Sequence, residues 1–293
     1  MIYSEDKKAL LCVPFEKTGS LDIEPETEDI RNYAIHPDSK VTQINIPSKV
    51  TLPNLKDEEC SAVFHTDSLK EIHVDKDNSR FISRKGVLFD RISNILLSCP
   101  ENRKELSYEI PEGTVGVASQ AFRSSPLTEL SIPSSLKYLR SQESNDIFLD
   151  HLDALEDLHV AKSNPNFTTT DCLTISNTDK SLIFYNSYNN KETVSVPEGV
   201  ETVSANVFGD ISSNLPEEII FHEGLKEIEE GNFNYIGQAD QWDKIIIHLP
   251  DSLKEISEGS FISSSGIELH VSKDSFGARY AKSHDIPYVI IPR

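Results

Sequence analysis

The stretch YEIPEGTVGVASQAF, residues 108–122, contains the pattern that decides the fold. The same pattern returns as VSVPEGVETVSANVF at 194–208 and as IHLPDSLKEISEGSF at 247–261. In each copy an apolar residue is followed two positions later by a second one, which precedes a proline. Further apolar residues usually come four and seven positions after the second, and a phenylalanine closes the copy at plus twelve.

This template is an internal repeat that runs along the chain. If the second apolar residue is position zero, neighbouring copies are 22 to 36 residues apart, and a higher-order unit of 86 to 87 residues contains three of them. The zero positions are Ile23, Ile46, Val74, Ile110, Ile132, Val160, Val196, Phe221, Leu249 and Val271. The plus-twelve positions are Ile35, Phe122, Phe208, Phe233 and Phe261.

The template predicts stacked strands. Apolar residues at minus two and zero alternate with polar ones, which is the period of a half-buried strand. Proline at plus one ends that strand because it cannot donate to a ladder. No copy can bury its apolar residues alone, so neighbouring copies must stack, and we expect the zero and plus-twelve residues to form the core. Paired apolar runs predict β-hairpins at 2–12, 86–100 and 173–185.

The pattern closely resembles the BspA-type leucine-rich repeats, which occur mainly in bacterial surface proteins and in some protists. The resemblance rests on Ile-Pro-Glu-Gly at 110–113, Val-Pro-Glu-Gly at 196–199 and Gln-Ala-Phe at 120–122, and it extends along essentially the whole chain. It implies a β-rich α/β leucine-rich-repeat solenoid: a right-handed coil with a parallel sheet on one face, β-hairpin insertions and a C-terminal cap. We expect one domain, 1–293, with higher-order units at about 1–80, 81–167 and 168–273 and the cap at 272–293.

The four cysteines, Cys12, Cys60, Cys99 and Cys172, never form a C-x-x-C pair, which disfavours zinc and redox sites. Cys12 and Cys99 lie in similar apolar runs, LLCVP at 10–14 and LLSCP at 96–100. These resemble matching positions in two copies of one unit. We therefore expect both to be buried, unpaired small hydrophobes.

The formal charge of −20, from 48 acidic and 28 basic residues, disfavours a nucleic-acid partner. Membrane insertion is not expected, because no run approaches the roughly 20 apolar residues that span a bilayer. Nor does the N-terminus resemble a signal peptide. The sequence contains none of the common nucleophile-elbow, zinc-protease or phosphate-loop motifs, so we predict a non-enzyme without cofactor or metal.

The residues at minus one and minus three point away from the predicted core and form a candidate binding face. Three acid-x-His pairs recur there, and two histidines fall on neighbouring strands, so a metal or pH-responsive surface is one interpretation and copied ancestry is the other. Outward Ile220 and Ile246 either seed an apolar contact patch or are covered by the insertion at 237–243. The candidate face is Glu71, His73, Glu109, Glu129, Asp157, His159, His248, Glu268 and His270.

Two functions stay open. The first is a non-catalytic interaction or adhesion module, monomeric and at the cell surface or outside the cell, which binds a protein or glycan of a host or neighbouring cell. The second is a structural scaffold or spacer whose functional segment lies outside this chain. The resemblance implies the location but names no ligand, so the partner has to be argued from exposed residues.

Overall fold

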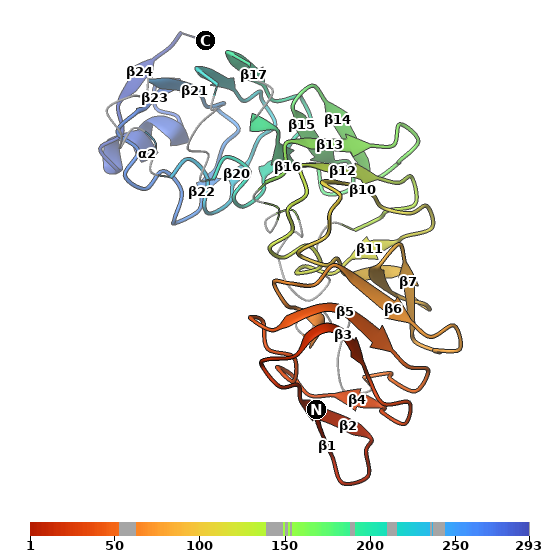
Figure 1. Cartoon of the computed structure of the whole chain (residues 1–293). Coiled ribbons are helices and arrows are strands. Elements are labelled where there is room, and N and C mark those ends of the chain that lie inside the picture. Colours follow the sequence, from red (N-terminus) through yellow and green to blue (C-terminus); the bar gives the residue numbers. More distant parts are fainter. Residues whose placement is uncertain are drawn as a thin grey trace. The chain divides into compact units, whose positions relative to one another are not determined.

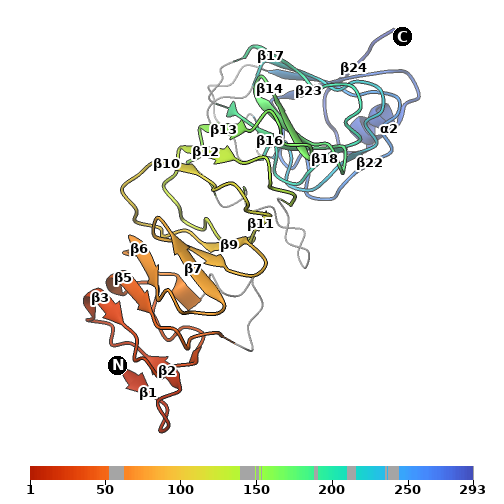
Figure 2. The ribbon, with the colours of Figure 1, turned by 90° about the vertical axis from the view of Figure 1, so that its right-hand side faces the viewer.

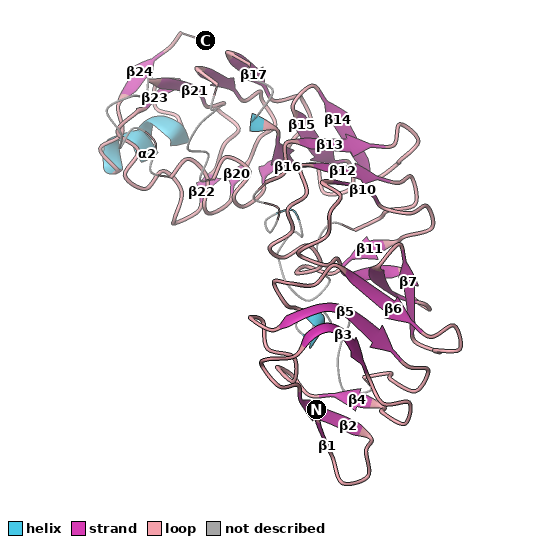
Figure 3. Ribbon diagram, in the orientation of Figure 1, coloured by secondary structure: helices cyan, strands magenta, loops and turns pink. Residues whose placement is uncertain are grey.

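The computed structural model describes residues 1–52, 63–138, 149, 152, 154–187, 191–209, 216–234, 236 and 244–292. The described chain is β-rich, with short strands, several parallel sheets and little helix (Figure 3). It divides into two compact units, Met1–Asn164 and Pro165–Arg293, called here the N-terminal and C-terminal units.

In each unit the strands that contain the minus-two positions, directly before or including position zero, pair in parallel and form what we call the front sheets (Figure 1). The N-terminal unit has two. One joins β3 (Thr18–Asp22), β5 (Lys40–Ile46) and β6 (Glu71–Val74), and the other joins β10 (Ser107–Glu109), β12 (Glu129–Ile132) and β13 (Asp157–Val160). The C-terminal unit has one, made of β17 (Thr193–Ser195), β19 (Glu218–Ile220), β21 (Ile245–His248), β23 (Ile267–Val271) and β24 (Tyr288–Ile290).

The plus-seven positions form a second set of strands, which the sequence had not predicted. These short strands continue, in parallel, from the last strand of each hairpin, and we call the combined sheets the back sheets (Figure 2). In the N-terminal unit they are β1 (Ile2–Tyr3), β2 (Ala9–Cys12) and β4 (Asp29–Ile30), and β7 (Phe81–Arg84), β8 (Val87–Asp90), β9 (Ile95–Ser98) and β11 (Gly116–Val117). In the C-terminal unit they are β14 (Phe167–Thr170), β15 (Leu173–Ser176), β16 (Ser181–Tyr185), β18 (Thr202–Val203), β20 (Glu227–Ile228) and β22 (Glu255–Ile256).

All three predicted hairpins are present, as β1–β2, β8–β9 and β15–β16. The last two each gain an additional strand, β7 and β14. The predicted front sheet is interrupted in the N-terminal unit after β6, where a hairpin follows. There Ile72 donates its backbone N–H to the Gly86 carbonyl over 2.9 Å, and the Ser83 hydroxyl donates to the Ile72 carbonyl. The hairpin thus takes the hydrogen bonds that a following front strand would need.

The core is the predicted one. All five plus-twelve residues are buried, and so are eight of the ten zero positions. The two exceptions, Val74 and Val160, are half-buried and lie at the ends of β6 and β13, directly before a hairpin strand. In the C-terminal unit the plus-twelve rings lie against one another with centroids 4.9 Å apart: Phe208 is stacked on Phe233, and Phe261 is tilted by 31° against Phe233.

Two buried asparagines each hydrogen-bond the repeat that precedes their own. Asn78 donates from its side-chain amide to the carbonyls of Pro47 (2.8 Å) and Val50 (2.9 Å), and Asn164 donates to Pro133 and Leu136 in the same way. Both asparagines stand four residues after a half-buried valine. Ser275 stands four residues after Val271, which is buried, and caps helix α2 (Phe276–Ser283), so a helix follows where the other two copies continue into a hairpin.

The expected burial of Cys12 is wrong. Cys99 and Cys172 are buried, but Cys12 is exposed, and all three are free; Cys60 lies outside the described residues. The reason lies in the hairpin partner: Cys12 pairs with Ile2, which is 59% exposed, whereas the corresponding residue of the second hairpin, Ser98, is buried and pairs with buried Leu88. Leu10 pairs with Ile30 as Leu96 pairs with Val117, so Cys12 corresponds to Ser98 and Cys99 to Val13.

Candidate binding face

The residues at minus one and minus three lie on the solvent side of the front sheets, as predicted. None of them is buried, whereas every minus-two residue between them is. Parallel pairing in register places equivalent residues of neighbouring copies side by side: Gln43 beside Glu71, and Asn45 beside His73. We call these outward residues of the front sheets the binding face.

Each predicted acid-x-His pair is in contact. The imidazole Nε2 of His73 lies 3.1 Å from a carboxylate oxygen of Glu71, and that of His159 lies 3.3 Å from one of Asp157. These two pairs, on β6 and β13, are about half exposed. The acid and the histidine of each pair are two residues apart on one strand. Their side chains therefore project from the same side of the sheet and lie next to each other.

The other two predicted glutamates of the N-terminal unit lie on the front sheet β10–β12–β13. Glu129 is exposed between Ser107 on one side and Asp157 on the other, so two carboxylates stand on adjacent strands. Glu109 lies beside Ser131, in the row that His159 occupies on β13. This sheet therefore presents an acidic row next to a row of polar side chains.

The C-terminal unit brings its predicted residues closest together. His248 and His270 lie opposite each other on β21 and β23, with ring centroids 4.7 Å apart and the rings edge to face. His270 Nε2 lies 3.1 Å from Glu268, and Lys244 also bonds the Glu268 carboxylate. Hydrogen bonds from Lys244 and His270 hold the pKa of Glu268 below its ordinary value, with Lys244 the larger influence.

Two contributors to this cluster were missing from the predicted face. Glu218 on β19 accepts from His248 Nε2 at 2.8 Å, and His222 bonds the Ser195 hydroxyl at 2.7 Å. Glu218 shares the minus-three column with Glu268, so the repeat register could have identified it. His222 stands at plus one, where five of the ten copies have proline. Its departure from the template was the available signal.

Residues 90–182 and 180–277 match the BspA type leucine-rich repeat region, with six copies. The chain belongs to the BspA-type leucine-rich repeat family. The matched residues include the front strands β10 to β23 and most of the binding face. The comparisons indicate no enzyme family, and no curated protein matches the chain.

One solved structure of a leucine-rich repeat protein supports the fold of this BspA-type protein, and two others are similar over much of the chain at lower TM-scores. A leucine-rich repeat protein from Eubacterium ventriosum has a TM-score of 0.52 at 16% identity, over 88% of this chain and 66% of that one. A leucine-rich cell surface protein from Faecalibacterium prausnitzii has a TM-score of 0.43 at 17% identity, over 87% and 54%. The pneumococcal vaccine antigen PcpA has 0.41 at 14%, over 97% and 85%. The chain thus spans less than two thirds of the first two proteins.

The face of this BspA-type protein shows no metal-binding geometry in the described ranges. No group of three or more His, Cys, Asp or Glu side chains there is arranged to hold an ion. Within the same ranges no helix has the length and apolarity needed to cross a bilayer. Ile220 and Ile246 are half-buried on β19 and β21. The insertion 237–243, which was expected either to cover them or to leave them free, lies outside the described residues.

Proposed function

We propose that the chain is an interaction module whose binding face contacts a protein or glycan ligand. The observation that carries the proposal is the contrast between columns: the inward minus-two residues are all apolar and buried, whereas the outward residues are mostly acidic, polar or imidazole side chains and vary from copy to copy. Solenoid repeats present extended binding surfaces in this way. A face that served only solubility would not need ordered pairs such as Glu218–His248 and Glu268–His270.

The proposal includes an architecture and a location. We propose that the copies of the template form one continuous right-handed coil over 1–293, with residues 272–293 as its cap. The same strand and back-strand pattern in both units supports this. We also propose that the protein acts as an adhesin-like module at the cell surface or outside the cell, as family membership suggests, and that it is a monomer.

The chemistry of the face favours basic protein patches or glycan hydroxyls as the ligand. Carboxylates from Glu71, Glu129 and Asp157 accept hydrogen bonds, and the net charge of −20 attracts cationic surfaces. Binding to a basic partner is expected to weaken as salt rises, because charges are screened over about 10 Å at 0.1 M ionic strength.

An array of purified extracellular-matrix proteins and oligosaccharides tests the proposal. We expect wild-type binding to at least one basic protein or glycan, and at least tenfold weaker binding by the triple variant Glu71→Lys, Glu129→Lys, Asp157→Lys. A matched control, Glu5→Lys, Glu230→Lys, Glu258→Lys, changes the charge equally at exposed positions off the face and should bind normally. Equal loss in both triples would mean that net charge alone drives binding. No binding to any array member would favour the scaffold function.

A further inference from the structure

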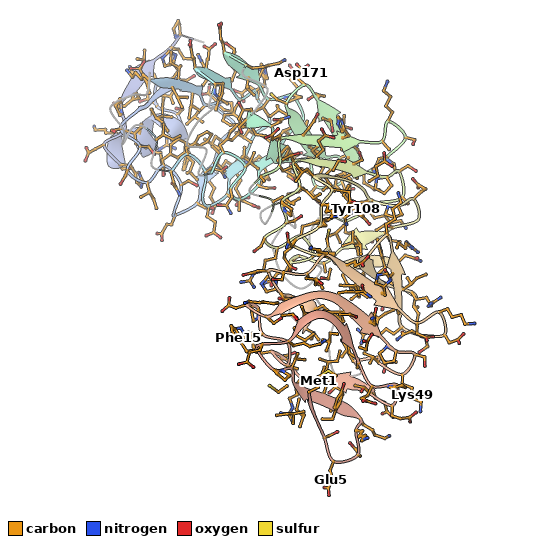
Figure 4. The ribbon with its side chains drawn as sticks, viewed as in Figure 1. Met1, Glu5, Phe15, Lys49, Tyr108 and Asp171 are labelled. Carbon is orange, nitrogen blue, oxygen red and sulfur yellow. The ribbon has the colours of Figure 1, made fainter. Side chains whose placement is uncertain are left out.

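Two ionisable side chains, both largely buried, bridge the interruption of the front sheet in the N-terminal unit. His65 lies in the segment that leads into β6, and Glu101 lies in the turn between β9 and β10, so the two residues precede the strands on either side of the interruption. Tyr108 on β10, labelled in Figure 4, marks the C-terminal side of the interruption. The imidazole Nδ1 of His65 hydrogen-bonds a carboxylate oxygen of Glu101. This contact joins two parts of the unit that no pairing of front strands connects.

Burial makes the charge on the imidazole important. The side chain of Glu101 is 6% exposed and that of His65 is 13% exposed. The second carboxylate oxygen, Glu101 Oε2, makes no hydrogen bond within the described residues. A buried carboxylate is strongly destabilising unless a cation and hydrogen bonds compensate it. His65 is the side chain that offers Glu101 this compensation, and it does so fully only when the ring is protonated.

Two other charged side chains act on His65, and both are exposed. A carboxylate oxygen of Asp67 lies 3.8 Å from His65 Nε2, on a side chain that is 64% exposed. The charge of Arg123, which is also exposed, disfavours a proton on the ring. Because solvent screens exposed charges, the buried carboxylate of Glu101 dominates. Its hydrogen bond raises the pKa of His65 above the ordinary 6.5, although burial opposes the increase.

The raised pKa fixes the direction of the pH effect. The contribution of His65 to stability is complete below pH 6.5 and is lost as the pH rises through the raised pKa of the folded state. Above that pKa the carboxylate remains buried beside a neutral ring. Burial also raises the pKa of Glu101 above its ordinary 4.5, so at lower pH this residue acts in the same direction.

Hydrogen bonds on two sides hold the segment 63–69 between neighbouring copies. Towards the preceding copy, the Thr66 hydroxyl donates to the Pro37 carbonyl over 2.8 Å. Towards the following one, the Asn102 backbone N–H donates to the Leu69 carbonyl over 2.7 Å. The imidazole–carboxylate contact lies on this second side. Its loss should therefore loosen the contact between Leu69 and Asn102 and leave the one between Thr66 and Pro37 in place.

We propose that His65 and Glu101 form a pH-dependent clamp across the interruption of the front sheet. While the imidazole carries a proton, the clamp holds the segment 63–69 against the turn that contains Glu101. When the imidazole is neutral, the buried carboxylate loses its compensation, and the contact between Leu69 and Asn102 opens more often.

The clamp also bears on the binding face. β6 carries Glu71 and His73, whereas β10 carries Glu109. These two front strands do not pair with each other, so the clamp helps to hold the two parts of the face together. The pH dependence would be present whether or not the face binds a ligand, so it can be tested apart from the proposed function.

Hydrogen exchange of the full chain at about pH 6 and about pH 8.5, on either side of the range in which histidines titrate, tests the clamp. After correction for the intrinsic pH dependence of exchange, the Asn102 amide should open at least about fivefold more often at the higher pH. The Asp67 amide, which donates to the Pro37 carbonyl, should be equally protected at both. His65→Gln should abolish the pH dependence at Asn102. His36→Gln makes the same substitution at a 55% exposed side chain of the same unit and should preserve it.

An NMR titration of the histidine rings gives a second measurement that needs no variant. The pKa of His65 in the wild type should lie above 6.5, and Glu101→Gln should lower it, because a neutral amide replaces the carboxylate. A wild-type pKa below 6.5 would overturn the clamp. Equal exchange of Asn102 at the two pH values, or a pH dependence that His65→Gln leaves intact, would overturn it as well.

Discussion

At the residue scale, the plus-twelve phenylalanines form a continuous row of packed rings in the core of the C-terminal unit. Phe233 is fully buried and packs against Phe208 and Phe261, with ring centroids 4.9 Å apart in each pair. Phe233→Ala should lower the free energy of unfolding by about 3–5 kcal/mol, because a ring-sized cavity opens between two neighbours that cannot close it. Urea denaturation measures this loss. Ile262→Ala, at a 42% exposed position, is the control and should cost far less. A loss below about 1 kcal/mol for Phe233→Ala would contradict the repeat register.

The buried side chain of Asn78 stabilises the fold through hydrogen bonds, because its amide group pairs with backbone N–H and C=O groups. Besides donating to Pro47 and Val50, it accepts the backbone N–H groups of Arg80 and Phe81 through its side-chain oxygen. Asn78→Ala leaves several buried backbone groups unpaired, at about 1–3 kcal/mol each, so we expect at least about 2 kcal/mol of destabilisation. Chemical denaturation tests this, and full stability in the variant would contradict it.

Prediction of side-chain burial succeeded where the two-residue alternation of a strand decides it, and failed where pairing with another strand or a turn decides it. The alternation of strands identified the core and the outward residues, because side-chain direction follows directly from a period of two. The burial of Cys12 was mispredicted because its exposure depends on the strand that it pairs with, where Ile2 is itself exposed, and the apolar run around Cys12 does not reveal that partner. Asn78 and Asn164 were overlooked because a polar residue in a turn gives no sign of its burial.

At the element scale, the strands of the back sheet in the C-terminal unit are preceded by a column of charges. Glu201, before β18, bonds Lys180 at 2.7 Å and also bonds Lys226, which precede the neighbouring strands β16 and β20. These two lysines hold the pKa of Glu201 at about 2, far below its ordinary 4.5, with Lys180 the larger influence.

A depressed carboxyl pKa stabilises the folded state at pH values above 4.5, and this contribution is lost as the pH falls from 4.5 towards 2. Because these side chains are largely exposed, the effect on total stability is modest. We therefore expect the clearest change in the titration itself. Lys180→Met should raise the pKa of Glu201 towards 4.5 in a carboxyl-carbon NMR titration. An unchanged pKa would show that this ion pair does not form in solution.

Helix α2 begins at a serine cap. The Ser275 hydroxyl accepts the Ala278 N–H at 3.1 Å, which satisfies one of the free donors of the first turn. Ser275→Ala should cost about 1 kcal/mol of stability, whereas Ser275→Asp should retain it, because aspartate is an equally good cap. Thermal unfolding of the two variants measures the difference, and equal Tm values would contradict the role of the cap.

The sequence predicted the elements more completely than their connections. Hairpins and front strands follow from local apolar runs, but the back strands are only two residues long and have no alternation of their own. Each back strand pairs with the back strand of a neighbouring copy, so it forms only when the copies stack. This is a tertiary interaction that the local sequence does not reveal. The interruption of the front sheet at β6 likewise depends on where Gly86 places its carbonyl.

At the scale of the whole molecule, the proposed continuous coil has a thermodynamic consequence. Stacked copies are coupled through their neighbours, so stability spreads along the array. If the chain is one domain, calorimetry should show a single unfolding transition, and Phe233→Ala in the C-terminal unit should shift all of it to lower temperature. Two transitions, of which only one moves, would mean that Met1–Asn164 and Pro165–Arg293 unfold as separate domains.

The central claim is that ligands bind on the outward side of the front sheets, and carboxyl footprinting tests it most directly. Carbodiimide labels exposed carboxylates, and mass spectrometry compares the free chain with its complex with the strongest binder from the matrix and glycan array. We expect Glu71, Glu129 and Asp157, or Glu218 and Glu268, to lose labelling in the complex, while Glu5, Glu230 and Glu258 label as before. Protection of the second set, with the face labelled as in the free chain, would contradict the claim.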